Sequence, residues 1–198
     1  LATYELTGLI LSVGIVLGAS GINVAHELGH RFTKERFIAK ALLLPCLYMH
    51  FFIEHNYGHH QNIATNADPA TAKYNHPLYL FWITSICGQY LSAWKIQINL
   101  LKKQHKNFFS IKNDMFWYLI LTFIYLGIVT SIFGTLGTII AVLTATVGFL
   151  LLETINYIEH YGLLRHKTKS GRYERVREMH SWNSNHVIGR IVLYELTR

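Results

Sequence analysis

Cysteine and charge are both scarce in this 198-residue chain. Its two cysteines, Cys46 and Cys87, lie inside apolar stretches and form no C-x-x-C pair, which excludes a disulfide framework and a thiolate cluster. Charged residues make up 15% of the chain, below the roughly 25% of soluble domains. No GxGxxG or P-loop motif is present. These absences favour a membrane protein whose metal ligands would be nitrogen and oxygen atoms.

The longest uncharged stretch runs from Met115 to Leu152 and contains no Asp, Glu, Lys, Arg or His. It is too long for one membrane crossing and suits two, at roughly 20 residues each, with "SIFGTLGT" (131–138) as the turn. A third apolar stretch, 1–25, lacks the basic start and the cleavage site of a signal peptide. We therefore expect an all-α membrane helical bundle. It would form a single membrane-embedded domain over 1–198, with spans at about 4–25, 115–134 and 136–157.

Positive charge is confined to two blocks, 31–112 and 165–198, which together hold all 18 Lys and Arg. The positive-inside rule places both blocks in the cytoplasm. Segment 37–53 is expected to be interfacial or re-entrant, because a crossing would separate two groups of histidines. The mixed polar and aromatic segment 78–104 is expected to lie in the interface. With its charge gathered next to apolar spans, the chain is expected to contact membrane lipid and no nucleic acid.

Histidine is abundant, with 12 residues, and three short segments carry the informative ones. "VAHELGHRF" (24–32) contains H-E-x-x-H, a zinc protease signature that places two histidines on one helix face. "EHNYGHH" (54–60) adds three more, and "NYIEHYG" (156–162) adds one at the end of the last predicted span. The predicted topology brings all three segments to one membrane face. The candidate metal ligands are His26, His30, His55, His59, His60 and His160.

Each of these segments also contains a carboxylate, namely Glu27, Glu54 and Glu159. A metal-bound imidazole usually donates its other N–H to a carboxylate or carbonyl, so we expect these three to support the ligands. Asp68, directly before Pro69, is interpreted as a turn residue.

The number of histidines argues against a single catalytic zinc, which takes three protein ligands and one open position. Six neutral nitrogens suit two iron ions that keep open positions for dioxygen as co-substrate. Two alternatives remain from the residues alone. A membrane zinc protease would hold one metal ion per chain, and a metal transporter would place histidines in the middle of a span.

Several segments together resemble the integral-membrane alkane hydroxylases of bacteria, and more distantly the histidine-box desaturases and xylene monooxygenases. They are "HELGHR" (26–31), "EHNYGHHQNIATNADPATAK" (54–73), "NYIEHYGLLR" (156–165) and "HSWNSNH" (180–186). The third is the most discriminating, because it separates alkane hydroxylases from desaturases. The resemblance implies a cytoplasmic-side diiron site in the bacterial inner membrane. It also implies terminal hydroxylation of n-alkanes, with electrons from rubredoxin and a rubredoxin reductase upstream. A fatty-acyl desaturase or hydroxylase, or a xylene monooxygenase-like enzyme, is the alternative.

The resembling family carries a further histidine box of the form "HSDHH" just after a segment like "LYELTR", where this sequence reaches Arg198. We therefore expect a partial gene product, which alone would be inactive. His180 and His186 belong to the "HSWNSNH" segment and are not assigned as ligands.

The segment "LLRHKTKSGRYERVR" (163–177) is strongly basic and directly follows the last histidine segment. It could anchor the chain to anionic lipid, at roughly 1 kcal/mol per charge near the surface. It could also form a docking surface for rubredoxin, since rubredoxins are acidic and complementary charge raises association rates. The residues predicted for this surface are Arg165, Lys167, Lys169, Arg172, Arg175 and Arg177.

Overall fold

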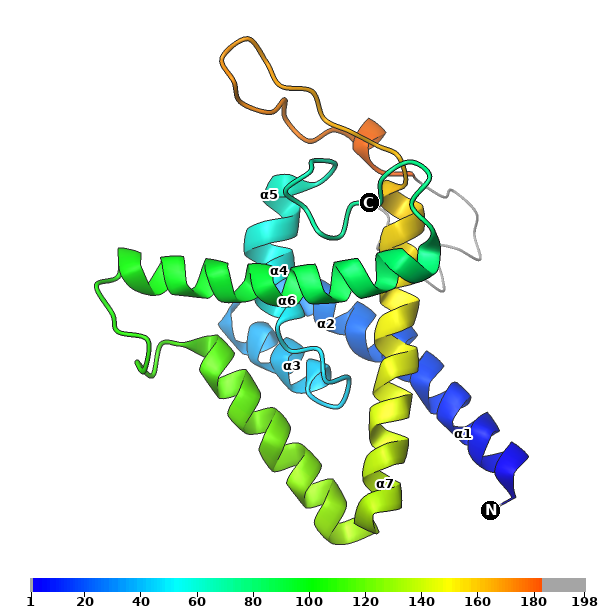
Figure 1. Cartoon of the computed structure of the whole chain (residues 1–198). Helices are drawn as coiled ribbons and strands as arrows, with labels where there is room; N and C mark the ends of the chain where they lie inside the picture. Colours follow the sequence, from blue (N-terminus) through cyan, green and yellow to red (C-terminus); the bar gives the residue numbers. More distant parts are fainter. Residues whose placement is uncertain (1, 183–198) are drawn as a thin grey trace.

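A computed structural model describes residues 2–182 of the chain, and its regular elements are helical (Figure 1). The all-α prediction is confirmed, since the β structure of the described residues is one isolated bridge between Lys167 and Tyr173. The α-helices are α1 Thr3–Val16, α2 Asn23–Gly29, α3 Thr33–Leu43, α4 Phe51–Glu54, α5 His60–Asn62, α6 Leu78–Lys103 and α7 Asp114–His160. Two π-helical stretches, η1 Leu17–Ile22 and η2 His55–His59, and the 3-10 turn η3 Glu178–His180 complete the order.

Helix α7 contains both of the spans that the sequence predicts between 115 and 157. It bends sharply at Gly134, where φ is +68° and ψ is −173°, and Figure 1 shows its two arms as a V. Glycine suits this bend because residues with a Cβ rarely adopt such a backbone conformation. The hydroxyls of Thr130 and Thr138, one on each arm, lie 2.7 Å apart and brace the bend. The turn expected at 131–138 is therefore made by a single residue.

Helix α1 packs against the second arm of α7 through small residues. A Cβ on Gly18 would lie 2.8 Å from the backbone oxygen of Gly148, and one on Gly14 would lie 2.5 Å from the Cβ of Val147. Both distances are shorter than carbon atoms tolerate, so the glycines allow the two backbones to approach closely. This close packing fixes α2, which continues from α1 through η1, relative to the end of α7.

Residues 31–54 leave the histidine end of the molecule and return to it. Helix α3 runs outward, the chain turns near Leu47, which has φ +52°, and α4 leads back to the second histidine segment. Lys40 on α3 forms a 2.6 Å ion pair with Asp114 at the start of α7, which ties this excursion to the helix bundle. Such a path agrees with a re-entrant segment, while its depth in a membrane stays a prediction.

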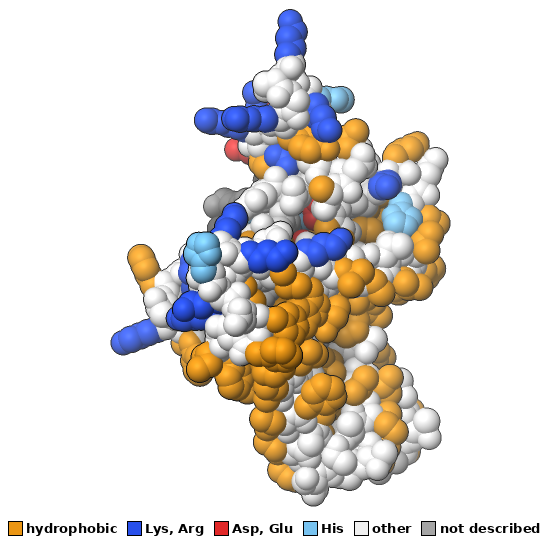
Figure 2. Space-filling model, turned by 60° about the vertical axis from the view of Figure 1, so that its left-hand side comes forward, with side chains coloured by type: hydrophobic (Ala, Val, Ile, Leu, Met, Phe, Trp, Pro, Cys, Tyr) orange, Lys and Arg blue, Asp and Glu red, His pale blue; other side chains and the backbone are white. Residues whose placement is uncertain are grey.

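Apolar and basic side chains occupy different parts of the surface. On the face drawn in Figure 2, Lys and Arg lie over the upper and middle parts, whereas the lower part, which contains the bend of α7, shows hydrophobic side chains and no Lys or Arg. Within residues 2–182, two helical stretches are long and apolar enough to cross a membrane, Thr3–Gly29 and Asp114–His160. Their exposed apolar side chains include Ile15, Phe123 and Ile132. The separation agrees with a protein whose charged end lies outside the bilayer.

Candidate metal centre

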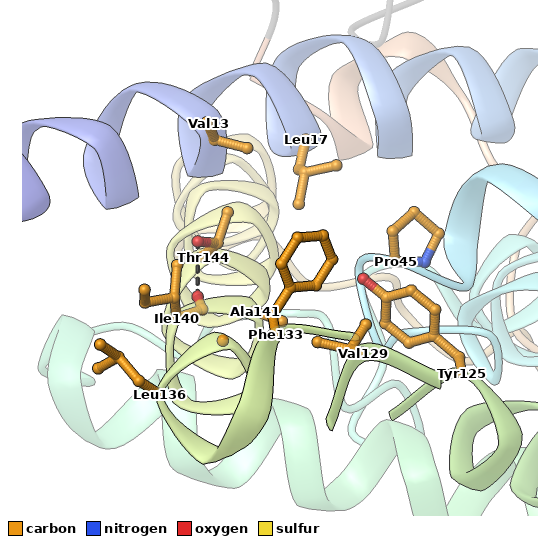
Figure 3. A pocket seen from close by; sticks show the side chains of 11 residues that line it. Val13, Leu17, Pro45, Tyr125, Val129, Phe133, Leu136, Ile140, Ala141 and Thr144 are labelled. Carbon is orange, nitrogen blue, oxygen red and sulfur yellow. Dashed lines mark hydrogen bonds between the residues drawn. The ribbon is translucent and has the colours of Figure 1, made fainter. Parts of the chain in front are cut away.

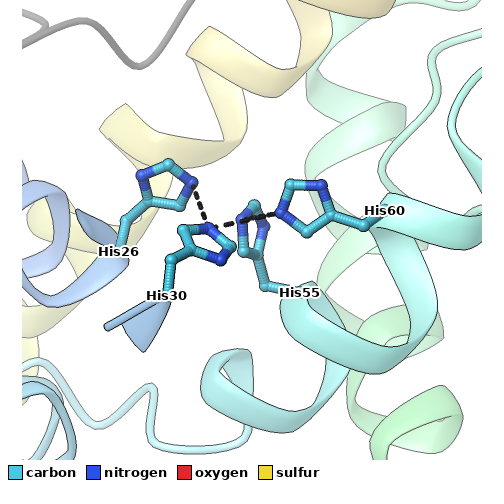
Figure 4. Close-up of side chains that lie close together, drawn as sticks. All are labelled: His26, His30, His55 and His60. Atoms are coloured by element: carbon cyan, nitrogen blue, oxygen red, sulfur yellow. Dashed lines mark hydrogen bonds between the residues drawn. The ribbon is translucent and has the colours of Figure 1, made fainter. Parts of the chain in front are cut away.

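Four imidazoles meet at the end of the molecule where α2 and η2 lie side by side (Figure 4). His26 and His30 come from one face of the α2 end, one helical turn apart, and His55 and His60 come from η2 and the start of α5. Their possible ligand atoms all lie within 4.8 Å of one another. The Nε2 atom of His60 lies 2.9 Å from that of His55 and 3.3 Å from that of His30. We call these residues the four-histidine group.

The geometry of the four-histidine group fits a metal ion. Nitrogens bound at about 2.1 Å to one ion in tetrahedral or octahedral arrangement are roughly 3.0–3.4 Å apart, close to the Nε2–Nε2 distances here. Burial and neighbouring imidazoles lower the pKa of His60 to about 4 and that of His55 well below its usual value. Both side chains are therefore neutral at pH 7, the form in which histidine binds metals.

The π-helical turn η2 is what brings His55 and His60 together. In a regular α-helix, residues five apart point in directions about 140° apart, whereas a π-helix places them on nearly the same face. A regular helix over 54–60 would instead pair His55 with His59. Gly58 lies inside η2, and a Cβ there would meet the Glu54 carboxylate at 2.6 Å and Ile96 at 2.9 Å. Glycine therefore leaves room for the tight packing of this turn.

His59 and His160 form a second group beside the first. Their ring centroids are 5.0 Å apart, and the His59 ring lies 5.3 Å from that of His55, so all six predicted ligands are contiguous. The Nδ1 atom of His160 donates to the backbone oxygen of His180 at 3.3 Å. Its Nε2 atom is buried and has no hydrogen-bond partner among the described residues. A buried nitrogen left free in this way fits a metal ligand. We call these two residues the His59–His160 pair.

Asp68 is the carboxylate that supports His59, a role that the sequence interpretation did not assign. Its Oδ2 lies 3.0 Å from His59 Nδ1, and Thr71 and the Ala70 backbone also donate to Asp68. Burial alone would lower the pKa of His59, but the charge and hydrogen bond of Asp68 raise it to about 9, so a metal ion binding at Nε2 would displace a proton from that nitrogen. Asp68 does make the predicted turn before Pro69, and the same turn aims its carboxylate at the histidine. The signal available in the sequence was a carboxylate eight residues after His60 and nine after His59.

The three carboxylates predicted to support the ligands have different surroundings. Glu27 pairs with Arg31 at 2.8 Å on the partly exposed side of α2. Glu54 is buried, accepts a long hydrogen bond from Ser92 at 3.4 Å, and has its other oxygen without a partner among the described residues. Glu159 is half-buried. Among the described residues, the hydrogen bonds of the Glu27 carboxylate go to Arg31 and not to a predicted ligand.

Arg165 does not belong to the predicted docking surface, which corrects the sequence prediction. Its side chain is 6% exposed, and its guanidinium donates to the backbone oxygens of Gln61 and Glu174. Its backbone nitrogen donates to Ala64 at 2.6 Å. Arg165 therefore joins the second histidine segment to the chain that follows His160. The other five residues are exposed and are called the basic surface: Lys167, Lys169, Arg172, Arg175 and Arg177.

Two histidines of the "HSWNSNH" segment were not assigned as ligands. His186 lies outside the described residues, and His180 is buried with its Nδ1 accepting from Arg177 N.

An apolar cavity of about 500 Å³ lies between α1 and the two arms of α7 (Figure 3). Val13 and Leu17 line it from the α1 side, and Phe133 and Ile140 line it near the bend of α7. Thr144, also in its wall, precedes His160 by sixteen residues, or about 24 Å along a helix. On the α1 side, Leu17 precedes His26 by nine residues, or roughly 13 Å along a helix, and no histidine among the described residues lines the cavity.

The sequence is similar to one protein family and to several known enzymes. The family model described as fatty acid desaturase matches residues 4–198. The chain is 40% identical to the alkane 1-monooxygenase of Ectopseudomonas oleovorans over 98% of the chain and 48% of that protein. It is 41% identical to alkane 1-monooxygenase 1 of Alcanivorax borkumensis over 100% of the chain and 49% of that protein. Identity to the xylene/toluene monooxygenase hydroxylase component of Pseudomonas putida is 26%, over 98% and 51%. The chain thus spans about half the length of the curated relatives it matches.

Proposed function

The chain belongs to the fatty acid desaturase family, and from this membership we propose that the full-length protein hydroxylates the terminal carbon of n-alkanes to 1-alkanols. Dioxygen is the co-substrate, and the electrons come from rubredoxin, which a rubredoxin reductase keeps reduced. The observation that carries the proposal is the identity of about 40% to alkane 1-monooxygenases across almost the whole chain. The convergence of six histidines supports it, because this chemistry needs a metal centre with nitrogen ligands.

The six histidines are proposed to hold two iron ions, one in the four-histidine group and one at the His59–His160 pair. Iron bound there would supply the activation of dioxygen and the oxidation of an unactivated C–H bond. The chain's own contribution is orientation. Asp68 holds the Nδ1 atom of His59, and the backbone oxygen of His180 holds the Nδ1 atom of His160. The Nε2 atoms of both residues are thereby left for the metal.

The apolar helices are proposed to lie in the bacterial inner membrane as a multi-pass bundle, with the metal centre on the cytoplasmic side. The two blocks of Lys and Arg support this orientation. An alkane dissolved in the bilayer would reach the protein through lipid-facing surface, and the cavity beside α1 offers an apolar space for its chain. The same apolar surroundings would keep water away from the reacting carbon.

Metal analysis and product analysis of the full-length protein test this proposal together. Protein purified in detergent is expected to hold about two iron ions per chain and little zinc. With n-alkane, dioxygen and reduced rubredoxin, it is expected to form the 1-alkanol. An unsaturated fatty-acyl product would instead identify a desaturase. One zinc ion per chain, with peptide-bond cleavage, would return the protein to the protease class.

The basic surface is proposed to dock rubredoxin. Reversing Arg172 and Arg175 to Glu should slow rubredoxin-dependent turnover several-fold at low ionic strength, and the difference should shrink as salt screens the charges. Iron content should stay at the parent value, because both side chains are exposed and lie twelve and fifteen residues after His160, the last of the predicted ligands.

A lysine pair outside the basic surface supplies the control for this prediction. Lys102 and Lys103 are exposed at the end of α6, and their reversal to Glu removes the same charge. Turnover in that variant should follow the parent at every salt concentration. If both pairs slow turnover equally, net charge is responsible. If neither does, the basic surface serves only as a lipid anchor.

A further inference from the structure

Glu153 is a fully buried carboxylate inside α7, and the metal centre as described makes no use of it. Its exposed fraction is 0%, and it lies in the second apolar arm of the helix, seven residues before His160. An ionisable group inside an apolar span is costly unless its oxygens are occupied, and such groups usually have a functional role. The surroundings of Glu153 indicate what that role is.

Four side chains donate to Glu153, from three different segments. Tyr48 donates from the turn before α4 at 2.9 Å, and Ser85 donates from α6 at 2.6 Å. Gln89, one turn further along α6, donates at 2.9 Å to both carboxylate oxygens and also to the Ser85 hydroxyl. Asn156 adds a longer contact of 3.4 Å from α7 itself. We call these five residues the Glu153 cluster.

The Glu153 cluster connects two elements that carry metal-centre histidines. Tyr48 lies three residues before Phe51, whose ring stacks on that of His55 with centroids 4.8 Å apart. The Tyr48 ring also stacks on Phe149 of α7, with centroids 5.2 Å apart. On the α7 side, Glu153 and His160 are two turns apart and so share one face of the helix. Helix α6, through Ser85 and Gln89, holds both sides in place.

From this arrangement we propose that Glu153 is a positioning residue of the metal centre. It fixes the height and rotation of α7 against the turn before α4, and thereby places His160 opposite His59. A shift of α7 by one residue would turn His160 by about 100° away from its partner. Glu153 itself touches no predicted ligand, so it acts only through the helix. The inference rests on the proposed metal centre and adds the residue that aligns its His59–His160 pair.

The test compares Glu153→Gln with Thr154→Val in the full-length protein. Glutamine keeps the size of the side chain but turns an N–H₂ group toward donors, which should loosen the Glu153 cluster. Thr154 accepts a hydrogen bond from Trp82 at 3.1 Å, so Thr154→Val breaks a neighbouring α6–α7 contact outside the cluster. The readouts are iron per chain, its resistance to a chelator and its Mössbauer spectrum, with thermal unfolding measured separately.

In Glu153→Gln, one of the two iron populations should change its Mössbauer spectrum and should be lost to the chelator several-fold faster than in the parent, because His160 is less well aligned. Thr154→Val should match the parent. Should Glu153→Gln fail to fold, Tyr48→Phe removes one donor and should give a smaller change in the same iron population. Parent-like iron retention and spectra in both Glu153→Gln and Tyr48→Phe would overturn this inference alone. A parent protein without bound metal would overturn the proposed function and this inference together.

Discussion

Replacing His60 with alanine is expected to remove about half of the iron from the full-length protein and to reduce alkane hydroxylation more than 100-fold. The reason is geometric, because the Nε2 atom of His60 approaches both His55 and His30 within 3.3 Å. Without it, the four-histidine group keeps three nitrogens, from His26, His30 and His55. Loss of even an outer partner of a ligand costs 10–100-fold, so loss of the ligand itself should cost more.

His166→Ala is the matched control for this substitution. His166 is exposed in the chain after α7, and its backbone nitrogen donates to Glu174. Removing its imidazole should leave the iron content unchanged. His59→Ala should also lower iron by about half but should affect the other spectroscopic population. If His60→Ala keeps all its iron, or if His60→Ala and His59→Ala alter the same population, the assignment to two groups is wrong.

Histidine spacing and charge predicted that three short segments meet, and the structure brings their six histidines together, while their role as ligands stays a prediction. The spacing could not predict how the second segment divides between two groups. A regular helix pairs His55 with His59, and only the π-helical turn brings His60 to His55. Such a turn depends on packing around Gly58, including its close approach to Ile96 of α6. That contact joins residues far apart in the sequence and leaves no local signal.

Buried polar contacts between distant segments were the other part that sequence reasoning missed. Arg165 stands among exposed basic residues in the sequence, yet its guanidinium reaches the backbone oxygen of Gln61. Glu153 follows an uncharged stretch and gives no sign that Tyr48 and Gln89 donate to it. The sequence around Arg165 is typical of an exposed surface, and the sequence around Glu153 is typical of a membrane span. Hydrogen bonds to distant segments make both side chains buried polar contacts instead. The bend of α7 was easier, because a run of small residues marked it and Gly134 makes it.

Replacing Asp68 with asparagine is expected to weaken iron binding at the His59–His160 pair by about 10–100-fold, with a similar loss of turnover. The Asp68 carboxylate lies 3.0 Å from His59 Nδ1 and is itself held by Thr71 at 2.6 Å and the Ala70 backbone at 3.1 Å. Asparagine fits the same space and can still accept one hydrogen bond, so the turn should survive. It lacks the negative charge that keeps the proton on Nδ1 and makes Nε2 a stronger ligand.

Glu174→Gln is the matched control, because it neutralises another carboxylate beside a histidine. Glu174 lies 3.6 Å from the Nε2 atom of His180, which is not a predicted ligand. Iron titration of both variants in the full-length protein separates a local effect from a general effect of lost charge. The result expected is weak binding of one iron in Asp68→Asn and parent-like binding in Glu174→Gln. Equal affinities in all three proteins would show that the Asp68 carboxylate only shapes its turn, and that His59 is oriented by packing against His55 and His160.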